Sequence, residues 1–252
     1  MAHINVENAT IEFPVYGSER SFRKFLFKNT IGGRIGHDTN DRVKITAIKN
    51  ASFDIGPGDR VGLIGQNGAG KSTLLKALAG IYEPVYGRIE VEGQVSAIFG
   101  TGLGIDGDDT GYRNIEICGL VLGMSEAEIA RKTDDIAAFT ELGEYLSLPV
   151  RTYSVGMQMR LTFAIATAIE PEILLMDETI GAGDAKFQTK AINRVGELMK
   201  RASILVLASH SNEIVRQYCS KAILLYFGEI IMFGDVEDVI AKYEEFVANE
   251  DI

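Results

Sequence analysis

The chain has 252 residues, of which 46% are hydrophobic, and this length suits one large α/β domain or two small ones. Lys and Arg total 25 against 35 Asp and Glu, so the net charge of −10 opposes binding to DNA across most of the surface. Cys118 and Cys219 have neither metal-binding nor disulfide spacing, and the N-terminus has no apolar signal core. Both observations predict that the chain stays in the reducing cytoplasm. The apolar stretches at 204–209 and 222–234 are too short for a membrane span of about 20 residues. We therefore expect neither a nucleic acid partner nor a membrane-spanning segment.

The first half of the chain changes from strand patterns to helix patterns. Residues 11–13 and 51–65 predict strands and turns, and residues 88–99 continue in the same style. Beyond Thr110 the pattern becomes helical, because SEAE at 125–128 forms a capping box ahead of a segment with helical periodicity. A helical insert is therefore expected after a strand-rich start.

The second half predicts a parallel sheet. The short all-apolar strands ILLM at 173–176 and ILVLA at 204–208 are separated by a helical pattern at about 187–201. Strands without polar residues that alternate with helices are typical of parallel sheets buried on both faces. The fold class expected from the residues is therefore α/β.

A phosphate-binding loop lies directly between a predicted strand and a predicted helix. GQNGAGKST matches the pattern G-x-x-x-x-G-K-S, in which glycines let backbone N–H groups turn toward phosphate oxygens at a helix N-terminus. Lys71 is expected to neutralise the outer phosphates, and Ser72 to supply a hydroxyl ligand to Mg²⁺. The alternative is a glycine-rich turn without a ligand. The expected nucleotide-binding positions are Gly65, Asn67, Gly68, Ala69, Gly70, Lys71, Ser72 and Thr73.

Two acids follow the apolar strand ILLM, as a magnesium-dependent NTPase requires. Asp177 is expected to hold the Mg²⁺ shell, and Glu178 to act as general base on the attacking water. His210 follows the strand ILVLAS and is a candidate for contact with the γ-phosphate. The alternative readings are an ordinary solvated strand end for the acids and a structural role for the histidine.

YSVGM at 153–157 predicts a second anion site, because Ser154 has the character of an N-cap and the small residues leave backbone N–H groups open. The chain has one lysine-containing loop. A separate anion site is therefore best explained by a two-fold dimer, in which each YSVGM closes over the nucleotide of the other copy. A simple capped helix is the alternative.

In their order along the chain, the loop GQNGAGKST, YSVGM, ILLMDE, GAGD and ASH resemble the nucleotide-binding subunit of an ABC transporter. The resemblance covers nearly the whole chain. More narrowly, YSVGMQMRL, GDAKFQ and TGYRNI resemble the ATPase subunits of bacterial polysaccharide exporters, which transport O-antigen, capsule, galactan or teichoic acid glycans.

The resemblance implies roles for five residues. It makes Ser154 and Gly156 contacts to the γ-phosphate of the opposite copy, Asp184 the link between the two sites, and His210 a switch histidine. Tyr16 is a candidate for stacking on adenine, although a tyrosine after a proline is equally well read as a packed edge residue.

The resemblance also implies a P-loop ABC ATPase fold, an α/β core with a mixed sheet and an inserted α-helical subdomain. Residues 1–104 and 162–234 would form the core, residues 105–161 the helical subdomain, and residues 235–252 a C-terminal helix. ATP and Mg²⁺ are the implied cofactors. The implied partners are a second copy of the chain, a separate membrane permease in two copies, and a lipid-linked polysaccharide, at the cytoplasmic face of the bacterial plasma membrane.

Two departures from the family pattern matter. The stretch AIFGTGLGID at 97–106 lacks the glutamine that many ABC proteins place there to reach Mg²⁺ and the membrane partner, so this coupling is assigned only to the region 100–113. Some O-antigen exporters carry a carbohydrate-binding domain after the ATPase, and here we expect none after the acidic C-terminal helix.

A basic segment at 18–36 stands out, because it contains five basic residues and one acidic residue in an acidic chain. Phe22, Phe25 and Leu26 have helical spacing, which predicts a helix near anionic headgroups or a pyrophosphate-linked lipid. The alternative is a helix that packs its apolar face on the domain.

Other members of the family, and other NTPases, are the remaining alternatives. An ATPase of a solute importer or drug exporter would share every catalytic residue, but YSVGM and the basic segment count against it. A soluble ABC ATPase acting on ribosomes or DNA usually joins two such domains. A P-loop kinase or GTPase would leave YSVGM unexplained.

Overall fold

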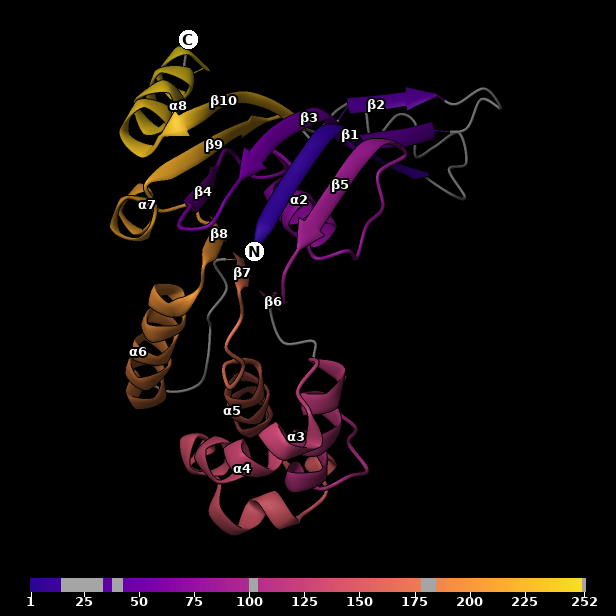
Figure 1. Cartoon of the computed structure of the whole chain (residues 1–252), viewed down its shortest axis with the longest axis vertical. Coiled ribbons are helices and arrows are strands. Elements are labelled where there is room, and N and C mark those ends of the chain that lie inside the picture. Colours follow the sequence, from indigo (N-terminus) through magenta and orange to yellow (C-terminus); the bar gives the residue numbers. More distant parts are fainter. Residues whose placement is uncertain (15–33, 38–42, 100–103, 178–184, 251–252) are drawn as a thin grey trace. The chain divides into compact units, whose positions relative to one another are not determined.

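The computed structural model describes residues 1–14, 34–37, 43–99, 104–177 and 185–250. The chain forms two compact units (Figure 1). The first contains Met1–Val95, Leu175–Glu178 and Ser203–Ile252, and the second contains Ser96–Leu174 and Thr179–Ala202. The division of the chain at residues 104 and 162, expected from the family resemblance, stays a prediction. Each unit is described by itself below.

An antiparallel sheet forms one side of the first unit. Its strands are β1 (His3–Pro14), β2 (Arg34–His37), β3 (Val43–Ile55) and β5 (Tyr86–Glu92), in the order β2-β3-β1-β5. Ile4 of β1 pairs with Ile55 of β3, and both side chains are fully buried. Buried residues alternate with less buried ones over His3–Glu7 of β1, and beyond the register shift at Val6–Ala9 three consecutive residues, Ala9–Ile11, are buried.

The second sheet has the strand order β10-β9-β4-β8-β7-β6. Its strands are β4 (Arg60–Ile64), β6 (Val95–Ile98), β7 (Ile173–Asp177), β8 (Ile204–Ala208), β9 (Lys221–Tyr226) and β10 (Glu229–Asp235). β4 pairs parallel to both β8 and β9, while β9 and β10 form an antiparallel hairpin. Every residue of β8 is buried, so the parallel, fully covered strand predicted from its apolar sequence is confirmed.

Three helices complete the described part of the first unit: α2 (Lys71–Leu78), α7 (Asn212–Tyr218) and α8 (Val236–Glu250). α2 contacts β8 of one sheet and β3 and β5 of the other, so it lies between the two sheets and buries Leu74, Leu75 and Leu78 there. α8 packs on β9 and β10, as Figure 1 shows. The contacts of α2 with both sheets hold its N-terminus next to the end of β4, the strand that precedes it in the sequence.

Apart from Ser96–Ile98 of β6 and Ile173–Leu174 of β7, the regular structure in the described part of the second unit is helical. It contains α3 (Gly111–Val121), α4 (Glu126–Thr140), the 3₁₀ turns η1 (Gly143–Ser147) and η2 (Val150–Thr152), α5 (Val155–Ala166) and α6 (Ala185–Arg201). The predicted change to helix after Thr110 is confirmed, because the Thr110 side chain caps α3 by accepting from the backbone N–H of Arg113 at 3.1 Å.

Two further features hold the helices of the second unit. The predicted capping box starts α4, since the Ser125 hydroxyl accepts from the Glu128 N–H at 3.3 Å and the Glu128 carboxylate accepts from the Ser125 N–H at 2.9 Å. The rings of Phe139, Phe163 and Phe187 contact one another with centroids 5.4 to 6.0 Å apart. Because these rings come from α4, α5 and α6, they join the three helices.

No helix within the described ranges is long and apolar enough to cross a membrane.

Candidate nucleotide site

The loop at 65–70 connects β4 directly to α2, which is the strand–loop–helix context that the motif requires. Gly70 is the N-cap of α2 and has φ +109°, a left-handed conformation that favours glycine. A Cβ built at Gly70 would lie 2.8 Å from the carbonyl oxygen of Ala47 in β3. The loop can therefore pass this close to β3 only with glycine at this position.

Lys71 is buried under the loop, with a residue exposure of 7%. Its ammonium donates hydrogen bonds to the carbonyl oxygens of Gly65 at 2.5 Å and of Gln66 at 3.0 Å. A buried ammonium needs such partners, because an unpaired charge away from water is costly. The first N–H groups of α2 have no intrahelical acceptor, so the same place combines a fixed positive charge with backbone donors.

Ser72 and Asp177 meet although 105 residues separate them in the sequence. The Ser72 hydroxyl donates to a carboxylate oxygen of Asp177, with Oγ and Oδ2 2.7 Å apart. Asp177 ends the buried strand β7, and Ser72 lies in the first turn of α2. A serine hydroxyl and a carboxylate are hard oxygen donors of the kind that Mg²⁺ prefers, so this pair fits the ion that the resemblance implies.

A cavity of about 210 Å³ brings most of the predicted nucleotide residues of the first unit together. It is lined by residues 67–73 of the loop and α2, together with Asp177, His210, Ala47 and Ala208. His210 follows β8, is exposed, and contributes to the lining of this cavity. Ala47 and Ala208 line the cavity without having been expected as site residues. Ala47 belongs to no motif, and Ala208 belongs to ASH, in which only the histidine was given a role.

Ser154 and Gly156 lie in the second unit, at the beginning of α5. The predicted N-cap is confirmed, since the Ser154 hydroxyl accepts from the Met157 N–H at 3.3 Å. Ser154 is exposed, and 74% of Val155 is exposed as well. A Cβ at Gly156 would meet only Ser154 Oγ, at 3.9 Å. The start of α5 is thus open within its unit, as a second anion site requires.

The placement of several predicted positions lies outside the described residues. They are Tyr16, Glu178, Asp184, residues 100–103 of the coupling region, and most of the basic segment at 18–36. Their roles stay predictions.

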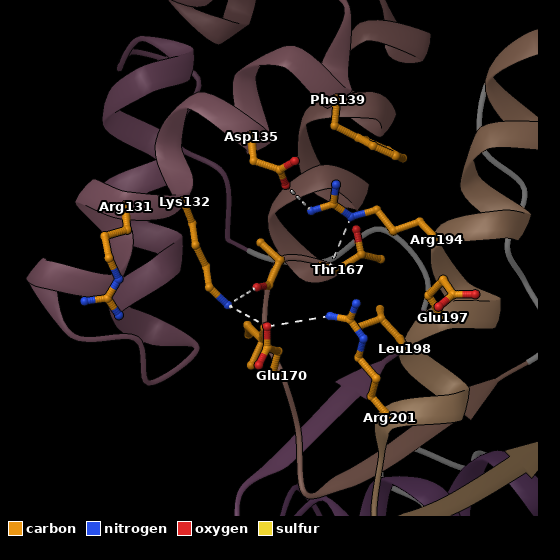
Figure 2. Close-up of a pocket in the computed structure, with 12 residues that line it drawn as sticks. Arg131, Lys132, Asp135, Phe139, Thr167, Glu170, Arg194, Glu197, Leu198 and Arg201 are labelled. Carbon is orange, nitrogen blue, oxygen red and sulfur yellow. Dashed lines mark hydrogen bonds and ion pairs between the residues drawn. The ribbon is translucent and has the colours of Figure 1, made fainter.

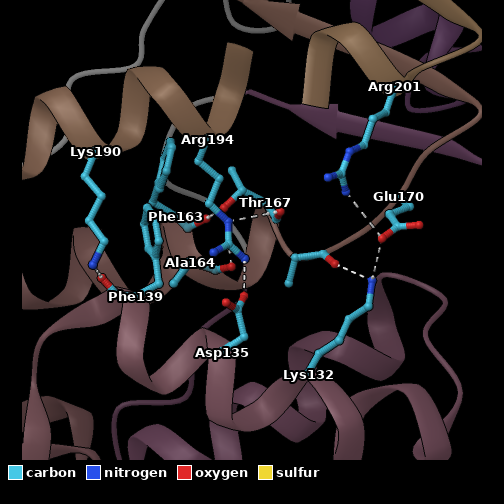
Figure 3. A network of polar contacts seen from close by, with 11 residues as sticks. Lys132, Asp135, Phe139, Phe163, Ala164, Thr167, Glu170, Lys190, Arg194 and Arg201 are labelled. Atoms are coloured by element: carbon cyan, nitrogen blue, oxygen red, sulfur yellow. Dashed lines mark hydrogen bonds and ion pairs between the residues drawn. The ribbon is translucent and has the colours of Figure 1, made fainter. Parts of the chain in front are cut away.

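A larger cavity of about 460 Å³ in the second unit contains none of the motif residues (Figure 2). Four basic side chains line it, but two of them already have partners at the C-terminus of α5. Lys132 donates to the Ala168 carbonyl at 2.7 Å, and Arg194 donates to the Thr167 carbonyl at 3.4 Å and to Asp135 at 2.8 Å (Figure 3). Cations at a helix C-terminus stabilise its unpaired carbonyls, which explains the charges of Lys132 and Arg194 without a ligand.

The comparisons with known proteins agree with this geometry. Residues 48–181, just over half of the chain, match the family model described as ABC transporter. The O-antigen export system ATP-binding protein RfbE of Yersinia enterocolitica is 46% identical over 231 residues, which cover 91% of this chain and 97% of RfbE.

Two other relatives are longer than this chain. The O-antigen export system ATP-binding protein RfbB of Myxococcus xanthus is 38% identical over 93% of this chain and 53% of its own length. The teichoic acids export ATP-binding protein TagH of Bacillus cereus is 34% identical over 97% of this chain and 43% of its own length. The chain thus spans about half of each of these two relatives.

Solved structures support the fold. An ATP-binding subunit of an ABC transporter matches with a TM-score of 0.68 and 23% identity, covering 96% of this chain and 93% of that chain. The dimeric ATP-binding cassette MJ0796 bound to ADP and Pi matches with a TM-score of 0.65 and 20% identity, covering 92% and 98%. With the fold, the phosphate loop and the relatives in agreement, the chain belongs to the ABC transporter family, as one of its ATP-binding, ATP-hydrolysing proteins.

Proposed function

We propose that the chain is the ATPase subunit of an exporter that moves a lipid-linked polysaccharide of the O-antigen or teichoic acid type across the cytoplasmic membrane. The observation that carries the proposal is the meeting of Lys71, Ser72, Asp177 and His210 at one cavity, in a chain that is 46% identical to an O-antigen export protein over most of both lengths. The residues at the cavity support ATP as the energy source, and the identity to the O-antigen export protein supports a polysaccharide as the cargo.

In the proposed reaction, the loop N–H groups and Lys71 hold the phosphates of ATP in the cavity. Ser72 and Asp177 would hold Mg²⁺, and the bound ion would supply positive charge next to the phosphate oxygens. Glu178 accepts a proton from the attacking water, and His210 contacts the γ-phosphate. The buried position of Lys71 supports this role, because the positive charge is already in place before the nucleotide arrives.

Two copies are proposed to close over two nucleotides, with Ser154 and Gly156 of each copy on the γ-phosphate of the other. The open, capped start of α5 supports this arrangement, since its first N–H groups are accessible and Ser154 is exposed. Closing and reopening would move a separate membrane permease between its states, and the chain would act from the cytoplasmic face of the membrane.

Purification from the membranes of its own host tests the proposal. The tagged chain is solubilised in detergent, and co-purifying proteins and glycolipids are identified by mass spectrometry. A multi-span membrane protein together with a lipid-linked polysaccharide supports the exporter. Co-purification with a small-solute permease, or with ribosomes, would reject polysaccharide as the cargo. The assignment of the chain as an ATPase would still hold.

A further inference from the structure

The turn between β9 and β10 is bonded to the phosphate loop, although no motif marks it. The Gly228 N–H donates to the carbonyl of Ala69 at 2.9 Å, and the Gly228 carbonyl accepts from the N–H of Lys49 at 2.8 Å. One residue of the turn therefore connects the phosphate loop to β3. Both bonds use backbone groups, so the sequence of the turn gives no direct sign of them.

Three backbone segments meet here without room for side chains. A Cβ built at Gly228 would lie 2.6 Å from the carbonyl oxygen of Ala47, the same atom that excludes a Cβ at Gly70. Gly228 also has φ +80°, which an L side chain rarely adopts. The close approach of β3, the loop and the turn thus depends on glycine at both 70 and 228.

Other contacts hold the turn in place. Lys49 forms an ion pair at 2.8 Å with Glu229, the first residue of β10, which adds a second connection to β3 directly beside the turn. The ring of Tyr226 contacts the ring of Phe227 at a centroid distance of 4.6 Å and that of Phe246 in α8 at 5.6 Å. The turn and the residues beside it therefore contact both β3 and α8.

We propose that Gly228 is a positioning residue of the ATP site, an inference that rests on the proposed function of the loop. The carbonyl of Ala69 and the N–H of Gly70 belong to one trans peptide, so they point in opposite directions. The bond from Gly228 to the Ala69 carbonyl therefore turns the Gly70 N–H away from the turn. Gly228 thereby keeps this N–H available as a phosphate donor, and Gly70 lines the cavity.

The test compares Gly228→Ala with Gly58→Ala. Gly58 has φ +90°, so both substitutions strain the backbone similarly, but a Cβ at Gly58 has nothing within 4 Å. ATP binding to each purified chain is measured by calorimetry with Mg²⁺ present, and the melting temperature is measured without nucleotide. We expect Gly228→Ala to bind ATP about tenfold more weakly than Gly58→Ala, a difference of about 1.4 kcal/mol. Equal affinities in the two variants would overturn the inference.

A second pair of variants serves if Gly228→Ala does not fold. Phe246→Ala removes the ring that supports Tyr226, whereas Val247→Ala shortens a neighbouring side chain that is 37% exposed. Weaker ATP binding is expected for Phe246→Ala alone, and equal binding in this pair would reject the role of the turn. If the wild-type chain itself fails to bind ATP, the proposed function fails instead, so the two results are distinguishable.

Discussion

The hydroxyl of Ser72 donates to the carboxylate of Asp177 across 2.7 Å, which places two hard oxygen donors from distant parts of the chain at one point. Asp177→Asn keeps the shape of the side chain but removes its charge. We expect turnover with MgATP to fall about 100-fold, equivalent to about 3 kcal/mol of transition-state stabilisation, and to recover partly at higher Mg²⁺. Asp54→Asn, an exposed carboxylate of β3 in the same unit, serves as the control and should keep normal turnover.

Glu178→Gln separates binding from hydrolysis. If Glu178 is the general base, the amide cannot accept the proton of the attacking water, so ATP still binds while most turnover is lost. Stalled nucleotides should then trap dimers, which size-exclusion chromatography with ATP detects. Glu172→Gln changes an exposed acid just before β7 and should leave turnover intact. Hydrolysis at the wild-type rate would remove Glu178 as the base.

Mixing two inactive variants tests whether each site uses both copies. Lys71→Ala removes the buried charge, and Ser154→Asp keeps an N-cap for α5 while its carboxylate repels a phosphate. In a mixed dimer both defects fall on one site, and the other site is intact. We therefore expect ATPase activity to reappear in the mixture, measured by phosphate release. If the mixture has no more ATPase activity than either variant alone, the proposal that each ATP site uses residues from both copies would be contradicted.

Arg194 connects α6 to the C-terminus of α5 and to α4 (Figure 3). Its side chain is 18% exposed and lies 4.4 Å from the ring centre of Phe139. Arg194→Met should lower the free energy of unfolding by about 1–3 kcal/mol, because the Thr167 carbonyl and Asp135 lose a charged donor. Arg201→Met is the control, since that side chain is 64% exposed and its ion pair is long at 3.8 Å. Denaturant unfolding of both variants measures the difference.

Cys219 gives a prediction for pH. Burial raises the pKa of its thiol to about 12, so the folded chain keeps it protonated. Its thiol should therefore resist iodoacetamide at pH 8, since the thiolate is the reactive form, and mass spectrometry of the native and unfolded chain tests this.

The raised pKa of Cys219 also predicts that the folded chain loses stability at high pH. Above pH 9, the unfolded thiol loses its proton while the folded thiol retains it, so the free energy of unfolding should fall as the pH rises from 9 toward 12. Cys219→Ala should make this part of the pH dependence shallower. An unchanged slope would show that the buried thiol does not contribute.

The parts of the site that could be predicted are those set by local patterns. A loop with fixed spacing between an apolar strand and a helix identifies Lys71 and Ser72, and two acids after a buried strand identify Asp177. The N-caps at Ser125 and Ser154 followed from the same kind of pattern, because a cap satisfies N–H groups only three residues away.

The rest depends on contacts between distant segments. The meeting of Ala47, Gly70 and Gly228 joins three segments through their backbones, and neither a side chain nor a period marks it. In the sequence, the segment that forms the β9–β10 hairpin is recognisable only as the apolar stretch at 222–234, and no local pattern predicts that its turn contacts the phosphate loop. The sheet order, with β4 between β8 and β9, was likewise outside the reach of local patterns.

Deletion of the gene in its own host tests the central proposal most directly. Surface polysaccharide and lipid-linked polysaccharide inside the cell are quantified in the deletion strain and after return of the wild-type chain, Lys71→Ala or Glu178→Gln. The account predicts that surface polysaccharide is lost and the lipid-linked precursor accumulates, and that only the wild-type chain restores export. Normal surface polysaccharide in the deletion strain, or full restoration by Lys71→Ala, would contradict an ATP-driven polysaccharide exporter.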